Sequence, residues 1–228
     1  KVNAWGSGPL VKDKLFLFAM YEWRDSSSRF TNASGSSLSR RESDNGFWGG
    51  KLDWQITDDH LLELLAFSDE GDSSTNLYTY NFAASTVGSA PPSLSTSSGG
   101  GKSGSITYTG RFGENFVAKA MWGTNRSQSV VYSPADQQCA QVIINSSYNA
   151  VYNSMGRPPV SCHPSTSASV VDHHDEREVG RLDFEWTLGS HQLRFGLDTE
   201  TMTTDRTTFY PGPTGQRFTI YSYAPGAV

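Results

Sequence analysis

The chain has 228 residues, of which 36% are hydrophobic, 18% charged and 12% aromatic, and its formal net charge is −5. Its most apolar stretch, around Leu15 to Tyr21, is far shorter than the roughly 20 residues of a membrane-spanning helix, which excludes a helical membrane protein. The acidic balance gives no basic footprint for nucleic acid, so we expect no nucleic-acid partner. The many aromatic, serine, threonine and glycine residues favour strands joined by polar loops.

Alternation of apolar and polar residues with period two predicts about eight strands in up-and-down order. The contrast is clearest in the segments Lys51 to Thr57 and Arg181 to Leu188. In chain order the predicted strands span roughly 1 to 8, 14 to 26, 45 to 57, 60 to 70, 103 to 113, 116 to 131, 172 to 188 and 191 to 208, with a ninth beginning near Phe218.

Short and long connections alternate between these strands. The short turns, near 11–14, 57–60, 113–115 and 189–190, carry the Asp, Asn and Gly residues typical of hairpins. Long polar stretches lie between them, at 25–44, 69–102, 133–170 and 211–218. Within them, 85–105 is nearly all Ser, Gly, Thr, Ala and Pro, which predicts a mobile loop. Short turns at one end and long loops at the other are typical of transmembrane barrels.

The two faces of the predicted strands differ in chemistry. One face carries mixed charges, too many for a packed core, and we expect it to line the lumen of a barrel whose other face contacts lipid. A secreted all-β domain with its charged face in water is the alternative. The expected lipid-facing residues are Leu52, Trp54, Ile56, Leu182, Phe184, Trp186, Leu193, Phe195 and Leu197, with Trp54, Phe184 and Trp186 in an interfacial aromatic belt. The expected lumen-facing residues are Lys51, Asp53, Arg181, Asp183, Glu185, Arg194 and Asp198.

The cysteines, Cys139 and Cys162, lie 23 positions apart in a polar stretch and belong to no CxxC pair. A disulfide between them is the preferred interpretation, and it implies an oxidising compartment. Two unrelated free thiols are the alternative.

Candidate sites for chemistry are few. The run Asp172 to Glu176 offers five metal-capable side chains, of which Asp172, His174 and Glu176 share a face in an extended strand. We interpret the run as a polar strand extension and expect no metal and no cofactor. No nucleophile elbow, HExxH, P-loop or GxGxxG motif is present, so we expect no enzyme activity. Loop aromatics that could stack on a ligand are Tyr78, Tyr80, Phe82, Tyr132, Tyr148, Tyr152, Phe209 and Tyr210.

Three segments together resemble TonB-dependent outer-membrane receptors, particularly the Oar-like branch. Ser7 to Glu22 is similar to the family segment GGPIIKDKLFFFGSYE, and Gly50 to His60 and His191 to Asp198 are similar to its KLDWQITDNH and HxLKFGxD hairpins. The resemblance implies a barrel of 22 strands filled by an N-terminal plug. This chain has about eight or nine predicted strands and no plug-like region before Gly8, so we interpret it as a piece of the first half of one barrel domain.

The resemblance implies an outer-membrane transporter whose surface loops capture a scarce, unidentified solute and whose plug is pulled by the TonB system of the inner membrane. Its partners are then outer-membrane lipid, TonB through the absent plug, and the solute. The alternative is a structural or adhesive outer-membrane or secreted β-protein that binds ligands through its loops. A secreted hydrolase is a third reading, without a catalytic constellation to support it.

Overall fold

A computed structural model describes residues 1–90, 92–133, 140–144 and 170–220, and all of its regular elements are strands. No described segment is a helix that could cross a membrane. The strands are β1 (Val2–Val11), β2 (Leu15–Trp23), β3 (Asp25–Thr31), β4 (Ser37–Asp44), β5 (Phe47–Thr57), β6 (His60–Ser68), β7 (Gly71–Asn81), β8 (Thr86–Val87), β9 (Ser93–Phe112), β10 (Phe116–Tyr132), β11 (Gln141–Ile144), β12 (Val170–Leu188), β13 (His191–Phe209) and β14 (Arg217–Ile220).

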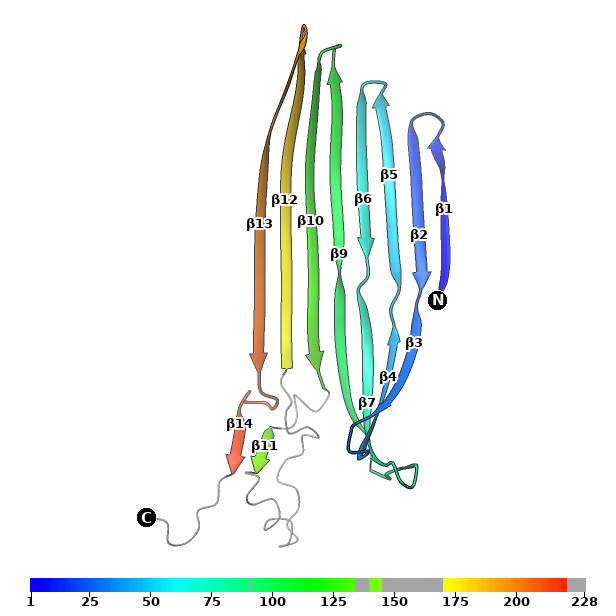
Figure 1. The fold of residues 1–228 in the computed structure, drawn as a ribbon, viewed down its shortest axis with the longest axis vertical. Helices are drawn as coiled ribbons and strands as arrows, with labels where there is room; N and C mark the ends of the chain where they lie inside the picture. Colours follow the sequence, from blue (N-terminus) through cyan, green and yellow to red (C-terminus); the bar gives the residue numbers. More distant parts are fainter. Residues whose placement is uncertain (91, 134–139, 145–169, 221–228) are drawn as a thin grey trace, which may run out of the picture.

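The main sheet is antiparallel and follows the order β1-β2-β5-β6-β9-β10-β12-β13. Strand β3 continues the direction of β2, β4 leads into β5, and β7 continues β6, so these short strands extend the same ribbons (Figure 1). In this extension β4 pairs with β3 and β7, and β7 pairs with β9. The predicted up-and-down antiparallel arrangement is confirmed.

The tight turns lie where the sequence predicts them. The connections after β1, β5, β9 and β12 contain two or three residues each, and all of them lie at the same end of the sheet (Figure 1). Asp13, Gly113 and Gly189 have φ values of 62°, 69° and 60°, the left-handed conformation that hairpin turns require. Asp and Gly are tolerated there at low steric cost.

The segments predicted as polar loops over 25–44 and 69–102 are mostly strand, and the first half of β9 lies within the predicted mobile loop 85–105. Ser97 shows the reason, because it is paired with Ser73 of β7 on one side and with Val131 of β10 on the other. Backbone pairing on both sides orders a Ser- and Gly-rich segment without burial of large side chains. The loop prediction considered side-chain burial alone and was therefore wrong here.

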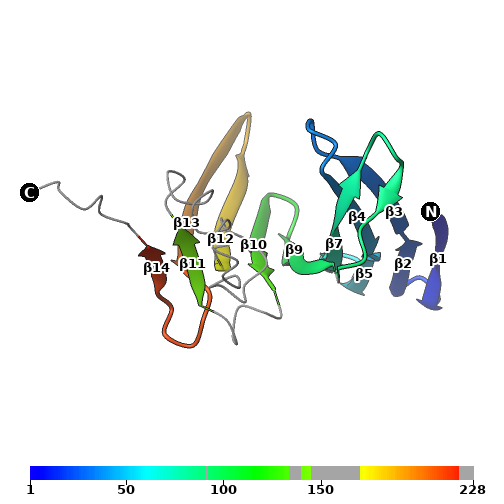
Figure 2. The same ribbon diagram turned by 90° about the horizontal axis from the view of Figure 1, so that it is seen from below.

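The main sheet is a single layer that does not close into a ring, with β1 and β13 at opposite ends of the strand order (Figures 1 and 2). Large apolar side chains are consequently exposed rather than packed between layers: Trp54 is 45% exposed, Leu182 40% and Leu193 46%. The strand predicted near Phe218 is β14, but it pairs in parallel with β11 in a separate two-stranded sheet.

Candidate functional site

The register between strands assigns the apolar residues to one face. Phe184 lies opposite Phe195 and Leu182 opposite Leu197, while Leu52 lies opposite Leu64. We call this surface the apolar face. It carries Leu52, Trp54, Leu62, Leu64, Ile106, Tyr108, Leu182, Phe184, Trp186, Leu193, Phe195 and Leu197. The register skips Ile56 at a β-bulge and gives it no cross-strand partner.

Ring contacts cross the apolar face beside the tight turns. The Phe116 ring lies 6.0 Å from that of Phe184 and 6.4 Å from that of Trp186. His60 Nδ1 lies 2.7 Å from Tyr108 Oη, so this end also contains a polar contact. An aromatic row with polar tips is the chemistry of an interfacial belt. From β6 to β13 the row consists of His60, Tyr108, Phe112, Phe116, Phe184, Trp186 and Phe195.

The opposite surface, which we call the polar face, brings the predicted charged residues together. Arg181 donates two hydrogen bonds to Asp183, at 2.8 and 2.9 Å, and Arg194 Nε lies 3.3 Å from Glu185 Oε2. Asp198 lies opposite Arg181 in the register. All these residues belong to β12 and β13, which therefore form a wall of paired charges. Such pairs at an exposed surface are geometrically defined but individually weak.

Further along the same wall, Arg177 donates hydrogen bonds of 2.8 and 3.1 Å to the two carboxylate oxygens of Glu200. The guanidinium compensates the negative charge of the carboxylate, and the two side chains are 50% and 49% exposed. Glu178 lies between Arg177 and Val179 and points to the opposite face, where it ends the run of apolar residues in β12.

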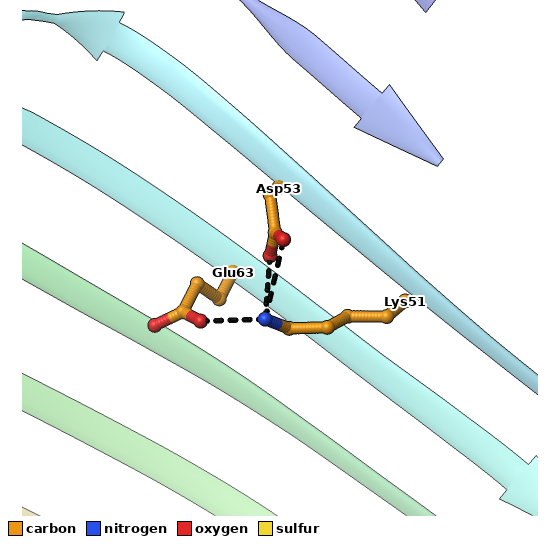
Figure 3. Close-up of polar contacts among 3 residues, drawn as sticks. All are labelled: Lys51, Asp53 and Glu63. Carbon is orange, nitrogen blue, oxygen red and sulfur yellow. Dashed lines mark hydrogen bonds and ion pairs between the residues drawn. The ribbon is translucent and has the colours of Figure 1, made fainter. Parts of the chain in front are cut away.

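The polar face of β5 and β6 holds a three-residue ion cluster (Figure 3). Lys51 Nζ lies 2.8 Å from Glu63 Oε1 and 3.0 Å from Asp53 Oδ1. The three side chains are partly exposed, at 41% for Lys51, 34% for Asp53 and 28% for Glu63. One ammonium group thus separates two carboxylates that lie directly opposite each other in the register. Like charges in that position destabilise a sheet unless they are compensated.

Apolar residues surround the ion cluster. Phe18 and Leu65 lie opposite Lys51 on its two sides, and Phe16 lies opposite Asp53. Phe16 is 42% exposed, Phe18 37% and Leu65 42%. Over β1, β2, β5 and β6 both faces of the sheet are consequently rich in apolar side chains. In the sequence, Leu15 to Trp23 and Leu61 to Phe67 carry apolar residues at both odd and even positions, but only the register shows that these residues form a continuous surface.

Beyond the apolar residues, the polar face carries a row of serines. Ser26 and Ser43 are hydrogen-bonded at 2.6 Å and Ser73 and Ser97 at 2.7 Å. Arg41 donates a 3.0 Å hydrogen bond to Ser73. These small side chains help to leave a polar hollow of about 580 Å³. This hollow was not predicted, because most of its residues were assigned to loops.

The candidate ligand-binding aromatics do not form one cluster. The Arg40 guanidinium carbon lies 4.9 Å from the centre of the Tyr78 ring of β7. The Arg217 guanidinium carbon lies 4.6 Å from the centre of the Tyr210 ring. Both rings therefore support neighbouring chain segments. Tyr80 is on β7 two residues beyond Tyr78, Phe82 directly follows that strand, and Tyr132 and Phe209 end β10 and β13. No ring–ring contact joins any of them within the part of the chain that the structure describes. Tyr148 and Tyr152 lie outside it.

The run Asp172 to Glu176 lies in β12, with alternate residues on opposite faces as predicted. His174 Nε2 lies 2.7 Å from Asp172 Oδ1, and Glu176 binds Arg126 instead, at 2.6 Å. Among the described residues no three His, Cys, Asp or Glu side chains are arranged to hold a metal ion. Cys139 and Cys162 lie outside the described residues, and their disulfide stays a prediction.

Comparison with known proteins identifies a family. No curated protein and no solved structure matches the chain significantly. A family model described as an outer membrane beta barrel domain matches residues 26–224, which is most of the chain. The antiparallel strands, the apolar face with its aromatic row and the tight turns gathered at one end agree with this match. The protein thus belongs to the outer membrane beta barrel domain family and is located in the outer membrane.

Proposed function

We propose that this chain is part of an outer-membrane transporter of the TonB-dependent type, which takes up a scarce solute through a plugged barrel. In this proposal the apolar face contacts lipid and the polar face lines the lumen. The chain contributes part of the barrel wall and part of the barrel entrance. It carries out no covalent chemistry and needs no cofactor. The similarity of Ser7 to Glu22 and of two hairpins to such receptors supports the proposal.

The observation that carries the proposal is the division of the polar face. Over β12 and β13 it consists of ion pairs such as Arg181 with Asp183, which suit a wet passage. Over β2, β5 and β6 it exposes Phe16, Phe18 and Leu65, which are too apolar to line a water-filled passage. The Lys51 ion cluster among them is too polar for a surface in contact with lipid. A protein body inside the barrel, covering one sector and leaving the other wet, satisfies both surfaces.

The sheet edges support a larger barrel. Within hydrocarbon every backbone N–H and C=O group needs a partner, so spanning sheets close on themselves. Strands β1 and β13 lie at the ends of the strand order and are exposed along their whole length. We therefore propose that further strands pair with both edges, which also makes room for an internal plug. A wide lumen of this kind agrees with the 22 strands implied by the resemblance.

Thiol labelling tests the covered sector. In a variant with Cys139→Ser and Cys162→Ser, single cysteines replace Leu65 or Lys119, which both lie on the polar face. We expect a membrane-impermeant maleimide to label Lys119→Cys in the intact protein and to leave Leu65→Cys largely unlabelled. Denaturation should make both react. Equal labelling of the two sites in the folded protein would remove the argument for an internal plug.

Growth experiments test transport itself. Cells lacking the protein should lose uptake of one solute when that solute is supplied at limiting concentration, and cells lacking TonB should show the same loss. An adhesive β-protein, the alternative, would affect surface attachment and leave uptake unchanged in both strains. We expect the intact protein to restore uptake, and a version that lacks the segment of the plug on which TonB pulls to fail to do so. This result would support TonB-dependent transport.

A further inference from the structure

We infer that the polar hollow over β3, β4, β7 and β9 is a binding site for a small, hydroxyl-rich acid, such as a sugar that carries a carboxylate or a phosphate group. The inference deepens the proposed function and rests on it in one respect, namely that the bound acid is the transported solute. The described strands contribute a line of interruptions, a row of hydroxyl groups and a guanidinium group that has no carboxylate partner.

The hollow lies along a line of interruptions in the strands. Arg24 separates β2 from β3, Asn45 and the following glycine separate β4 from β5, and Asp69 and the following glutamate separate β6 from β7 (Figure 1). In β9, Gly100 departs from strand conformation with a φ of 85°. These residues all line the hollow. Irregularities of this kind bend a strand and redirect its side chains, so the hollow is built into the backbone.

Hydrogen bonds across the interruptions fix the shape of the hollow. The Asn45 N–H group donates a 3.0 Å hydrogen bond to the Arg24 carbonyl. The Gly101 N–H group donates a 2.8 Å hydrogen bond to Asp69 Oδ1, and the Asp69 N–H group donates one of 3.1 Å to the Gly101 carbonyl. A Cβ atom on Gly100 would lie 2.3 Å from the Asp69 carbonyl oxygen, so the close approach requires glycine. A site that is already formed reduces the ordering cost of binding.

The row of serines gives the hollow its chemistry. Ser26, Ser43, Ser73 and Ser97 follow one another across the register of β3, β4, β7 and β9. A hydroxyl group both donates and accepts hydrogen bonds, so such a row suits a ligand that carries several hydroxyl groups of its own. The volume of about 580 Å³ lies within the range of about 300–1,000 Å³ of small-molecule sites.

Arg41 adds a positive charge to this row. Its guanidinium group donates the 3.0 Å hydrogen bond to Ser73, and Ser73 is only 6% exposed, so the contact holds the guanidinium in the hollow. The residues directly opposite Arg41 on its two sides are Ser28 and Thr75, which are both neutral. In the part of the chain that the structure describes, Arg41 forms no ion pair with a carboxylate. Its remaining N–H donors form a planar fork that matches a carboxylate or a phosphate group.

The other charged residues around the hollow are engaged elsewhere. Lys1 and Arg24 both pair with Glu22. Asp69 accepts a hydrogen bond from the backbone of β9. Asp25 borders the hollow, but alternation along β3 directs its side chain to the face opposite that of the serine row. An anion that binds the unpaired guanidinium therefore breaks no existing ion pair.

The test uses the intact protein, purified in detergent, and titration calorimetry. The probes are glucuronate, phosphorylated glucose, glucose, acetate and inorganic phosphate. We expect at least one acidic sugar to bind about tenfold more tightly than glucose, acetate and inorganic phosphate. The tighter of the two acidic sugars distinguishes a carboxylate site from a phosphate site. Equal affinity for glucose and the acidic sugars, or binding of neither acidic sugar at millimolar concentration, would overturn the inference. Inorganic phosphate that binds as tightly as phosphorylated glucose would overturn it too.

Variants locate the site on the sheet. Arg41→Gln should weaken binding of the acidic sugar about tenfold and leave binding of glucose unchanged. Arg29→Gln, on β3 and directed to the opposite face, is the control and should change neither affinity. Ser26→Leu should fill the hollow and weaken binding of both sugars, whereas Ser27→Leu, the next residue on the opposite face, should not. The inference is wrong if either variant binds like its control. Where a variant fails to fold, the comparison of sugars on the unaltered protein still decides.

Uptake assays separate this inference from the proposed function. If the purified protein binds the acidic sugar but cells take it up without TonB, the proposed function fails and the binding site stands. If uptake of the sugar depends on TonB and Arg41→Gln leaves it unchanged at limiting concentration, the inference fails and the proposed function stands.

Discussion

The two halves of the sheet have the same strand geometry but differ in the polarity of the side chains on the polar face. In β12 and β13 the alternation is strict, and Phe184 and Asp183 point to surfaces of different polarity. In β2 and β6 the alternation fails, because Phe18 and Leu65 share the polar face with Lys51 of β5. Period two therefore reports the environment of a strand reliably only where the two environments differ. In the plugged barrel that we propose, lipid covers one side of these strands and protein covers the other, which removes the contrast between the two faces.

The largest effect is expected from a charge on the lipid side of the strict half. Leu182→Arg should lower the free energy of unfolding in liposomes by about 2–4 kcal/mol, because Leu182 lies on the apolar face further from the tight turn than the aromatic row, where a guanidinium has no water. Leu193→Arg, closer to the tight turn at 189–190, should cost less. Asp183→Asn, on the polar face, should be mild. A larger loss from Asp183→Asn than from Leu182→Arg in urea titrations would reverse our assignment of the faces.

A smaller effect is expected in the half that is apolar on both faces. Lys51→Met removes the ammonium between Asp53 and Glu63 and leaves two carboxylates opposite each other. Since these groups are partly exposed, we expect a loss of about 1–2 kcal/mol in the same urea titrations, between the values for surface and buried pairs. Lys51→Arg should restore most of it. Arg181→Gln, among the ion pairs of β12 and β13, is the matched control and should cost less. If Arg181→Gln lowers the free energy of unfolding as much as Lys51→Met does, the ion pairs of the two halves lie in similar environments.

The smallest effect concerns the ion pair of Arg177 with Glu200, whose side chains are 50% and 49% exposed. An ion pair that is half exposed contributes little to stability. Glu200→Gln should therefore reduce the free energy of unfolding only slightly. The same urea titrations check this, and a loss as large as that of Lys51→Met would contradict it.

The fold was largely predictable because strand periodicity and turn chemistry are local. The hairpin from Arg181 to Asp198 needed only alternation and a Gly-Ser turn, and the register groups its apolar residues on one face as expected. The strand from Ser93 was not predictable in this way, since its order comes from β7 and β10, which are distant in sequence. A Ser- and Gly-rich segment has no apolar–polar pattern from which such distant pairing partners could be identified.

The candidate sites were predictable only in part. The charges of β12 and β13 were assigned to one surface from the sequence, and the register agrees with that grouping. Glu63 was missed as the partner of Lys51, because cross-strand neighbours depend on register rather than on spacing along the chain.

The serine-rich extension has a consequence for how this surface can change over time. Its strands are held by backbone pairing across β4, β7 and β9, and Ser26, Ser43 and Ser97 contribute hydroxyls rather than bulk. A scaffold ordered by its main chain tolerates replacement of its side chains, so substitutions in this extension should cost less stability than substitutions on the apolar face.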